Sequence, residues 1–210
     1  MKKDFLILQA CGHSDEKCEI ENIKAQAELY EMNVVTKCIN DVKCLEKALK
    51  ENGDFDYIYL SSHGSDVGFS NESEELNVNW TDFGEMICDT QCLKEGSILM
   101  LSCCRGGLNN VAYDMFWNCG NIEYVVGPRQ SLTSADILIG FNLLLYNLEH
   151  RGIDPIVASK KVLKGTDIRF KCFDRLETMS DPAYIIRAKE LEEELQRLYE
   201  EQINQNDESE

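Results

Sequence analysis

Short apolar runs alternate along the chain with longer segments in which apolar residues recur at helical spacing. The apolar runs predict strands at 4–10, 33–39, 56–62, 97–103 and 122–127. The intervening and following segments predict helices at 19–32, 41–52, 81–92, 107–118, 133–149 and 154–164. Thr133 and Asp136 form a variant of the capping box where the helix over 133–149 begins. Strands that alternate with helices in this way are typical of a parallel α/β sheet.

Two parts of the chain depart from this alternation. The segment 64–80 is rich in glycine, serine and asparagine and contains an alternating apolar stretch, which predicts a loop with a small hairpin. From residue 180 onward, apolar residues at helical spacing run through a very acidic segment, which predicts an appended helix over 180–203 and a disordered tail over 204–210. The apolar stripe of that helix either packs on its own domain or docks onto a partner helix or a second copy of the chain. The main domain is then expected to span 1–175.

Composition narrows the class of partner. The chain has 210 residues, of which 43% are hydrophobic, as expected for one large globular domain with an appendage. Its formal net charge of −17 is expected to repel nucleic-acid phosphates and anionic membranes and to favour basic partners or substrate segments. The apolar run at the N-terminus is too short for a signal peptide or a membrane span, so we expect a cytoplasmic protein.

Cysteine accounts for ten residues of the chain. A disulfide framework is not expected in a chain without an export signal, and most of the cysteines lie in core-like segments, where they act as small buried hydrophobes. The sequence contains no Cys-x-x-Cys pair, and the Cys88/Cys92 pair lacks a second matching pair of metal ligands. We therefore expect no metal site and no cofactor.

Two residues with catalytic chemistry follow predicted strands. His63 comes directly after the strand over 56–62, and Cys104 follows the strand over 97–103. The carboxyl ends of parallel strands meet at one edge of a sheet, where functional residues collect. A deprotonated thiol is a strong nucleophile, and an imidazole that titrates near neutrality assists it or protonates its leaving group. This pairing indicates a cysteine hydrolase.

Ser62-His63-Gly64 and Ser102-Cys103-Cys104-Arg105-Gly106 resemble the His-Gly and Gln-Ala-Cys-Arg-Gly signatures of caspase-type (clan CD) cysteine peptidases. The bacterial CHAT branch is similar in more detail, because its Leu-Ser-Ala-Cys-x-x-Gly parallels residues 101–107. The resemblance spans about residues 4–165 in the order of elements. It implies a caspase-like, mostly parallel sheet with helices on both faces.

The resemblance also implies a mechanism. Cys104 would attack a peptide carbonyl, His63 would protonate the departing amine, and the backbone N–H groups of Gly64 and Cys104 would form the oxyanion hole. Side chains alternate along a strand, so Cys103 should be buried if Cys104 faces the cleft. Should Cys103 be the nucleophile, the alignment of the signature is displaced by one residue.

Specificity is less defined by sequence. Caspases bind the substrate residue before the cut with an arginine that follows the strand after the nucleophile, and Arg129 lies at the matching position. Ser102 lies at the position where caspases have the glutamine of their signature. Arg129 would then select an acidic residue before the cut. The overall acidity instead favours a basic residue there, with Asp66 or Asp136 lining the pocket. Arg105 either lowers the pKa of the Cys104 thiol or anchors a nearby carboxylate.

Other functions remain to be weighed. The chain lacks the sequence patterns of a class I amidotransferase and of a cysteine phosphatase. A non-catalytic caspase-like scaffold that binds a partner protein is compatible with the same residues. By resemblance to CHAT proteases, we expect a peptidase controlled by a partner or ligand, often within a bacterial antiviral defence system, with a protein or peptide as substrate.

Overall fold

A computed structural model describes residues 2–51, 53–190, 193 and 197. The chain divides into two compact units, Met1–Arg175 and Leu176–Glu210. In the second unit residues 182–190 are helical, as are 193 and 197. The remainder of the helix predicted over 180–203, and the tail predicted over 204–210, lie outside the described residues. No helix in the described ranges is long and apolar enough to cross a membrane.

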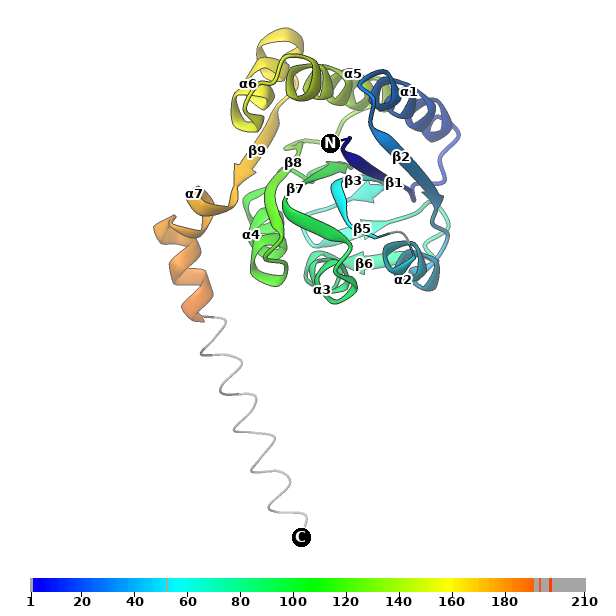
Figure 1. Cartoon of the computed structure of the whole chain (residues 1–210). Helices are drawn as coiled ribbons and strands as arrows, with labels where there is room; N and C mark the ends of the chain where they lie inside the picture. Colours follow the sequence, from blue (N-terminus) through cyan, green and yellow to red (C-terminus); the bar gives the residue numbers. More distant parts are fainter. Residues whose placement is uncertain (1, 52, 191–192, 194–196, 198–210) are drawn as a thin grey trace. The chain divides into compact units, whose positions relative to one another are not determined.

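A six-stranded sheet forms the centre of the first unit (Figure 1). Its strands, in spatial order, are β2 (Asn33–Cys38), β1 (Asp4–Gln9), β3 (Phe55–Ser61), β7 (Leu93–Ser102), β8 (Ile122–Pro128) and β9 (Phe170–Asp174). All neighbours pair in parallel except β8 and β9, which are antiparallel. The predicted α/β class with a mostly parallel sheet is confirmed.

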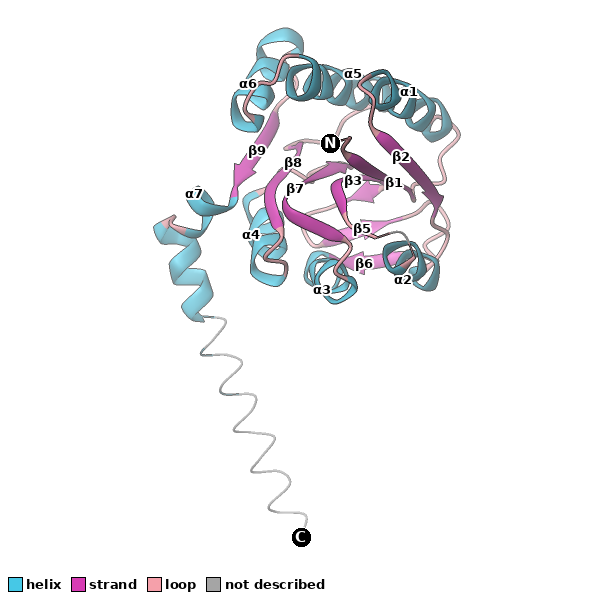
Figure 2. Ribbon diagram, viewed as in Figure 1, coloured by secondary structure: helices cyan, strands magenta, loops and turns pink. Residues whose placement is uncertain are grey.

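Helices cover both faces of this sheet (Figure 2). One face carries α1 (Glu16–Leu29), α5 (Ser134–Leu145) and α6 (Pro155–Thr166), and the other carries α2 (Val42–Lys50), α3 (Trp80–Thr90) and α4 (Asn109–Asn118). Strand β1 illustrates why the sheet needs two layers of helices. Phe5 and Ile7 belong to the apolar core beneath α1 and α5, whereas Leu6 and Leu8 belong to the core on the other face. All four side chains are fully buried, as expected for a central parallel strand.

The segment between β3 and α3 is more regular than predicted. It forms a separate three-stranded antiparallel sheet from β4 (His63–Gly64), β5 (Gly68–Ser70) and β6 (Asn77–Asn79). Phe69 and Val78 of this small sheet are buried and extend the core that contains α3. His63 therefore begins a second sheet at the point where β3 leaves the first.

The bounds of other helices and strands also differ from prediction. Helix α1 begins at Glu16 rather than residue 19, and the helix predicted over 133–149 continues from α5 into a π-helix, Tyr146–His150. The capping box of Thr133 and Asp136 is present at the start of α5. Strand β9 and the short helix α7 (Arg175–Met179) were not predicted. Strand β9 is only five residues long, and its antiparallel pairing lies outside the strand–helix alternation.

Candidate active site

The register of β3 and β7 places the two candidate catalytic residues at one edge of the sheet. Ser61 pairs with Ser102, and the backbone N–H of Ser62 donates to the Ser102 carbonyl at 3.3 Å. His63 and Cys104 each follow this last pair by two residues. His63 and Cys104 therefore occupy adjacent backbone positions, just beyond the ends of two neighbouring strands.

Gly64 brings the two strand exits into direct contact. A Cβ atom at this position would lie 2.5 Å from the Cys104 carbonyl oxygen and 2.8 Å from both Cβ and Sγ of Cys103. Those separations are far inside van der Waals contact, so only glycine fits without a shift of the backbone. The backbone of Gly64 thus packs against the Cys104 carbonyl and the Cys103 side chain.

The two cysteines have different environments. Cys103 is fully buried, and burial raises its pKa far above the usual range. Cys104 is half-buried, and its Sγ donates to the Leu132 carbonyl at 3.9 Å. A buried thiol with a raised pKa is a poor nucleophile. Of the two, Cys104 is the one that solvent and a substrate can reach.

The His63 ring contacts side chains from two other parts of the fold. Its Nε2 atom lies 2.8 Å from Oε2 of Glu72, on the turn between β5 and β6. The Cys11 thiol, on the loop between β1 and α1, lies 3.6 Å from Nε2 and 3.9 Å from Nδ1. Within the described part of the chain the polar partners of the His63 ring are Glu72 and Cys11, and Cys104 is not among them. Backbone proximity is present, but in this structure the imidazole and the Cys104 thiol have separate partners.

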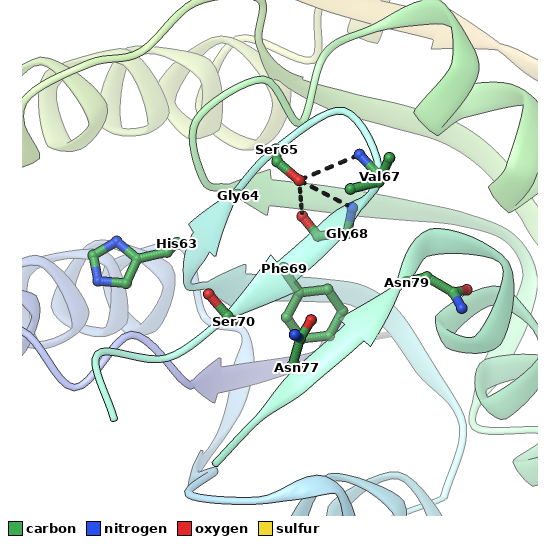
Figure 3. Close-up of a pocket in the computed structure, with 9 residues that line it drawn as sticks. All are labelled: His63, Gly64, Ser65, Val67, Gly68, Phe69, Ser70, Asn77 and Asn79. Carbon is green, nitrogen blue, oxygen red and sulfur yellow. Dashed lines mark hydrogen bonds between the residues drawn. The ribbon is translucent and has the colours of Figure 1, made fainter. Parts of the chain in front are cut away.

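A cavity of about 210 Å³ lies beside His63 over the small sheet (Figure 3). It is lined by residues of β4, β5 and β6 and of the turn that joins β4 to β5: His63, Gly64, Ser65, Val67, Gly68, Phe69, Ser70, Asn77 and Asn79. Ser65 orders this turn, because its Oγ donates to the Gly68 carbonyl and accepts from the N–H groups of Val67 and Gly68. Figure 3 shows the His63 ring directed away from Phe69 and Asn77.

A second cavity, of about 240 Å³, lies at the carboxyl ends of β1 and β2. The Glu72 turn forms one of its walls, and Gln9, Gly12 and Glu16 line it from the β1–α1 region. His63 therefore belongs to one cavity, and its partner Glu72 belongs to the other.

Beneath strand β7 lies a buried polar network. Ser102 Oγ and the Tyr59 hydroxyl both donate to Oε1 of Glu19, at 2.5 and 2.7 Å. Burial raises the pKa of the Glu19 carboxyl, although the two hydrogen bonds act in the opposite direction. Ser102, a candidate specificity residue, is buried and uses its hydroxyl in this network.

The other specificity candidates lie around the same edge. Arg129 is exposed directly after β8, and its backbone N–H donates to the Arg169 carbonyl. Asp66 forms an exposed ion pair with Arg105 at 3.8 Å, so Arg105 anchors a carboxylate, one of the two roles expected for it. Asp136 accepts from Thr133 in the capping box of α5.

Sequence reasoning missed three neighbours of these residues: Cys11, Glu72 and Glu19. Cys11 follows the carboxyl end of β1, which is the same signal that singled out His63 and Cys104. No local pattern marks Glu72 or Glu19, because acidic residues in a turn and on a helix are ordinarily solvated. No cluster of three or more potential metal ligands occurs among the described residues.

Of the comparisons with known proteins, the one with solved structures gives a match. No protein-family model matches the chain, and no curated protein matches its sequence. Among solved structures, the fold matches that of a secreted C11 cysteine protease from Bacteroides thetaiotaomicron, determined in complex with an irreversible peptide inhibitor. The TM-score is 0.59 at 10% sequence identity, over 84% of this chain and 67% of that one. The neighbour is a C11 protease and gives the CHAT branch no support. The chain thus has the fold of a caspase-like, clan CD cysteine protease.

Proposed function

We propose that this protein is a cysteine endopeptidase in which Cys104 is the nucleophile and His63 the general acid. The observation that carries the proposal is the Ser61–Ser102 register, which brings the two residues to adjacent backbone positions at the carboxyl edge of the sheet. The fold shared with a C11 cysteine protease supports the same assignment.

The reaction follows from the chemistry of the two groups. The Cys104 thiolate attacks the peptide carbonyl carbon, and the negative charge on the oxygen is stabilised by the N–H groups of Gly64 and Cys104. The C–N bond then breaks as the His63 imidazolium gives its proton to the departing amine. Water attacks the thioester, the neutral imidazole takes a proton from it, and the carboxylic acid and free enzyme are released. Turnover requires the Cys104 thiol to turn from the Leu132 carbonyl toward the substrate, within reach of the imidazole.

The substrate residue before the cut is a second part of the proposal. Arg129 and Ser102 are the candidates for a pocket that accepts an acidic residue, and Asp66 or Asp136 for one that accepts a basic residue. The net charge of −17 favours the basic alternative. Control by a regulatory protein partner and the bacterial defence context are proposals that rest on the sequence resemblance. The cytoplasmic location is a proposal that rests on the shortness of the apolar run within residues 1–10.

The test is cleavage of a broad peptide library by the wild-type chain and three variants. We expect Cys104→Ala to lose activity by about 1,000-fold or more and His63→Ala by about 100-fold or more. Cys103→Ala removes the same kind of side chain from a fully buried position, and this variant should retain most of the wild-type activity. Circular dichroism should first show that it folds. Loss confined to Cys103→Ala would move the nucleophile by one residue.

A non-catalytic scaffold is the second candidate. It is favoured by the separate partners of the two groups, because the Cys104 thiol donates to Leu132 and the imidazole binds Glu72. Equal activity of all four proteins in the library assay, in the presence and absence of candidate partners, would support the scaffold against the peptidase.

A further inference from the structure

The turn that carries Glu72 is anchored to the loops at the carboxyl edge of the main sheet. The backbone N–H of Glu72 donates to the Cys11 carbonyl at 2.8 Å. The neighbouring Asn71 is buried, donates from Nδ2 to the Asn40 carbonyl and accepts the Leu76 N–H on Oδ1. The turn is therefore held by the β1–α1 loop and the β2–α2 loop together. These hydrogen bonds set the position of the turn relative to His63, and they do not depend on the ion pair between Glu72 and His63.

Glu72 is the charged neighbour of the His63 ring. The groups that face the ring are Glu72, from the turn between β5 and β6, and Cys11, from the β1–α1 loop. Burial raises the pKa of the Cys11 thiol to about 11, and the charges of Glu16, Glu19 and Glu72 act in the same direction. Cys11 consequently stays a neutral thiol at physiological pH, and the carboxylate of Glu72 remains the group that stabilises an imidazolium.

We propose that Glu72 is a positioning residue that holds His63 by its Nε2–H and leaves Nδ1 for proton transfer at the Cys104 site. The inference rests on the proposed peptidase function. An imidazole whose one nitrogen donates to a carboxylate is fixed in tautomer and orientation, and its protonated form is favoured. Because the His63 and Glu72 side chains are 47% and 60% exposed, the electrostatic part of this effect is modest.

Kinetics of Glu72→Gln test the role, with Glu74→Gln as the matched control. Glu74 lies on the same turn, is exposed and carries the same charge, and the contacts of His63 do not include it. We expect kcat of Glu72→Gln to fall by about 3- to 10-fold with KM little changed, and Glu72→Asp to recover part of the loss. Glu74→Gln should match the wild-type chain.

NMR of the His63 ring separates this inference from the proposed function. The chain has three histidines, so the His63 resonances are assigned by their absence in His63→Ala. In a Cys104→Ala background, Glu72→Gln should change the ring ¹⁵N chemical shifts of His63, because the carboxylate that fixes the tautomer is gone.

Each outcome has a definite meaning. Unchanged ring ¹⁵N shifts of His63, or changed shifts with an unchanged kcat, overturn the positioning role. A rise in KM at constant kcat assigns Glu72 to substrate binding instead and also overturns it. Absence of Cys104-dependent turnover in the wild-type chain overturns the peptidase, whereas a Glu72-dependent change in the ring shifts would then leave only a structural ion pair.

Discussion

Position 64 has no room for a side chain, and this single restriction connects packing with the candidate chemistry. The backbone of Gly64 lies against the Cys104 carbonyl and the Cys103 side chain. An oxyanion hole requires a backbone donor that approaches the reacting oxygen closely, which a side chain at the same position would hinder. The same contact therefore sets the distance between the chain that leaves β3 and the chain that leaves β7.

Gly64→Ala should consequently be harmful in two ways. The added methyl group forces the backbone around Cys104 to move, which we expect to cost about 1 to 3 kcal/mol of unfolding free energy and most of the proposed Cys104-dependent turnover. Denaturant unfolding and peptide cleavage measure the two effects. Gly120→Ala is the matched control, because a Cβ atom there meets nothing within 4 Å. Equal stability and activity of the two variants would show that the strand exits can separate without consequence.

At the scale of elements, one buried carboxyl joins a helix to two strands. Glu19 of α1 accepts hydrogen bonds from Tyr59 of β3 and from Ser102 of β7, which lies two residues before Cys104. Burial raises its pKa in the folded protein above its ordinary value of 4.5. The folded state thus binds this proton more tightly than the unfolded state, so the contribution of Glu19 to stability is largest at low pH.

Glu19→Gln should remove this pH dependence. The amide oxygen keeps an acceptor for Tyr59 and Ser102, and the variant has no proton to lose. As pH rises from about 4.5 toward the raised folded pKa, the wild-type protein should lose stability relative to the variant, by up to about 1.4 kcal/mol per pH unit. Urea unfolding at a series of pH values measures the difference. Glu21→Gln, an exposed carboxylate on the same helix, should show no such trend, and a parallel trend in both variants would refute the assignment to Glu19.

The whole molecule carries a strong negative field. Its net charge of −17 is unusual for 210 residues and acts on every charged molecule that approaches it. If the proposed peptidase is correct, this field attracts basic substrate segments and repels acidic ones. Dissolved salt screens such long-range attraction within about 10 Å at 0.1 M.

Salt should therefore change substrate preference. Between about 20 and 200 mM salt, we expect kcat/KM for a lysine-rich peptide to fall by about 3- to 10-fold, while that for a glutamate-rich peptide of the same length stays constant or rises. Steady-state kinetics on the two peptides provide the measurement, each serving as the control for the other. A preference for the acidic peptide at low salt would instead favour a pocket built on Arg129.

Much of the fold was predictable because its elements are encoded locally. Alternating apolar runs and helical stripes gave five of the six strands of the main sheet, and the Thr133 capping box marked the start of α5. The small sheet over 63–79 was predicted only as a loop with a hairpin, since its strands are two or three residues long. Such short strands carry too few residues for a period to be recognised.

The sequence by itself determined the order of the elements and the placement of His63 and Cys104 after apolar runs, because strand periodicity and strand ends are local properties. Only the tertiary structure decided what surrounds them. Cys11 is 52 residues from His63 in sequence and still reaches its ring, while Glu72 approaches from a turn of the small sheet. Glu19, on an acidic helix, is buried where its side chain reaches from α1 to Tyr59 of β3 and Ser102 of β7. Contacts of this kind depend on how layers meet in space, which no local pattern of residues encodes.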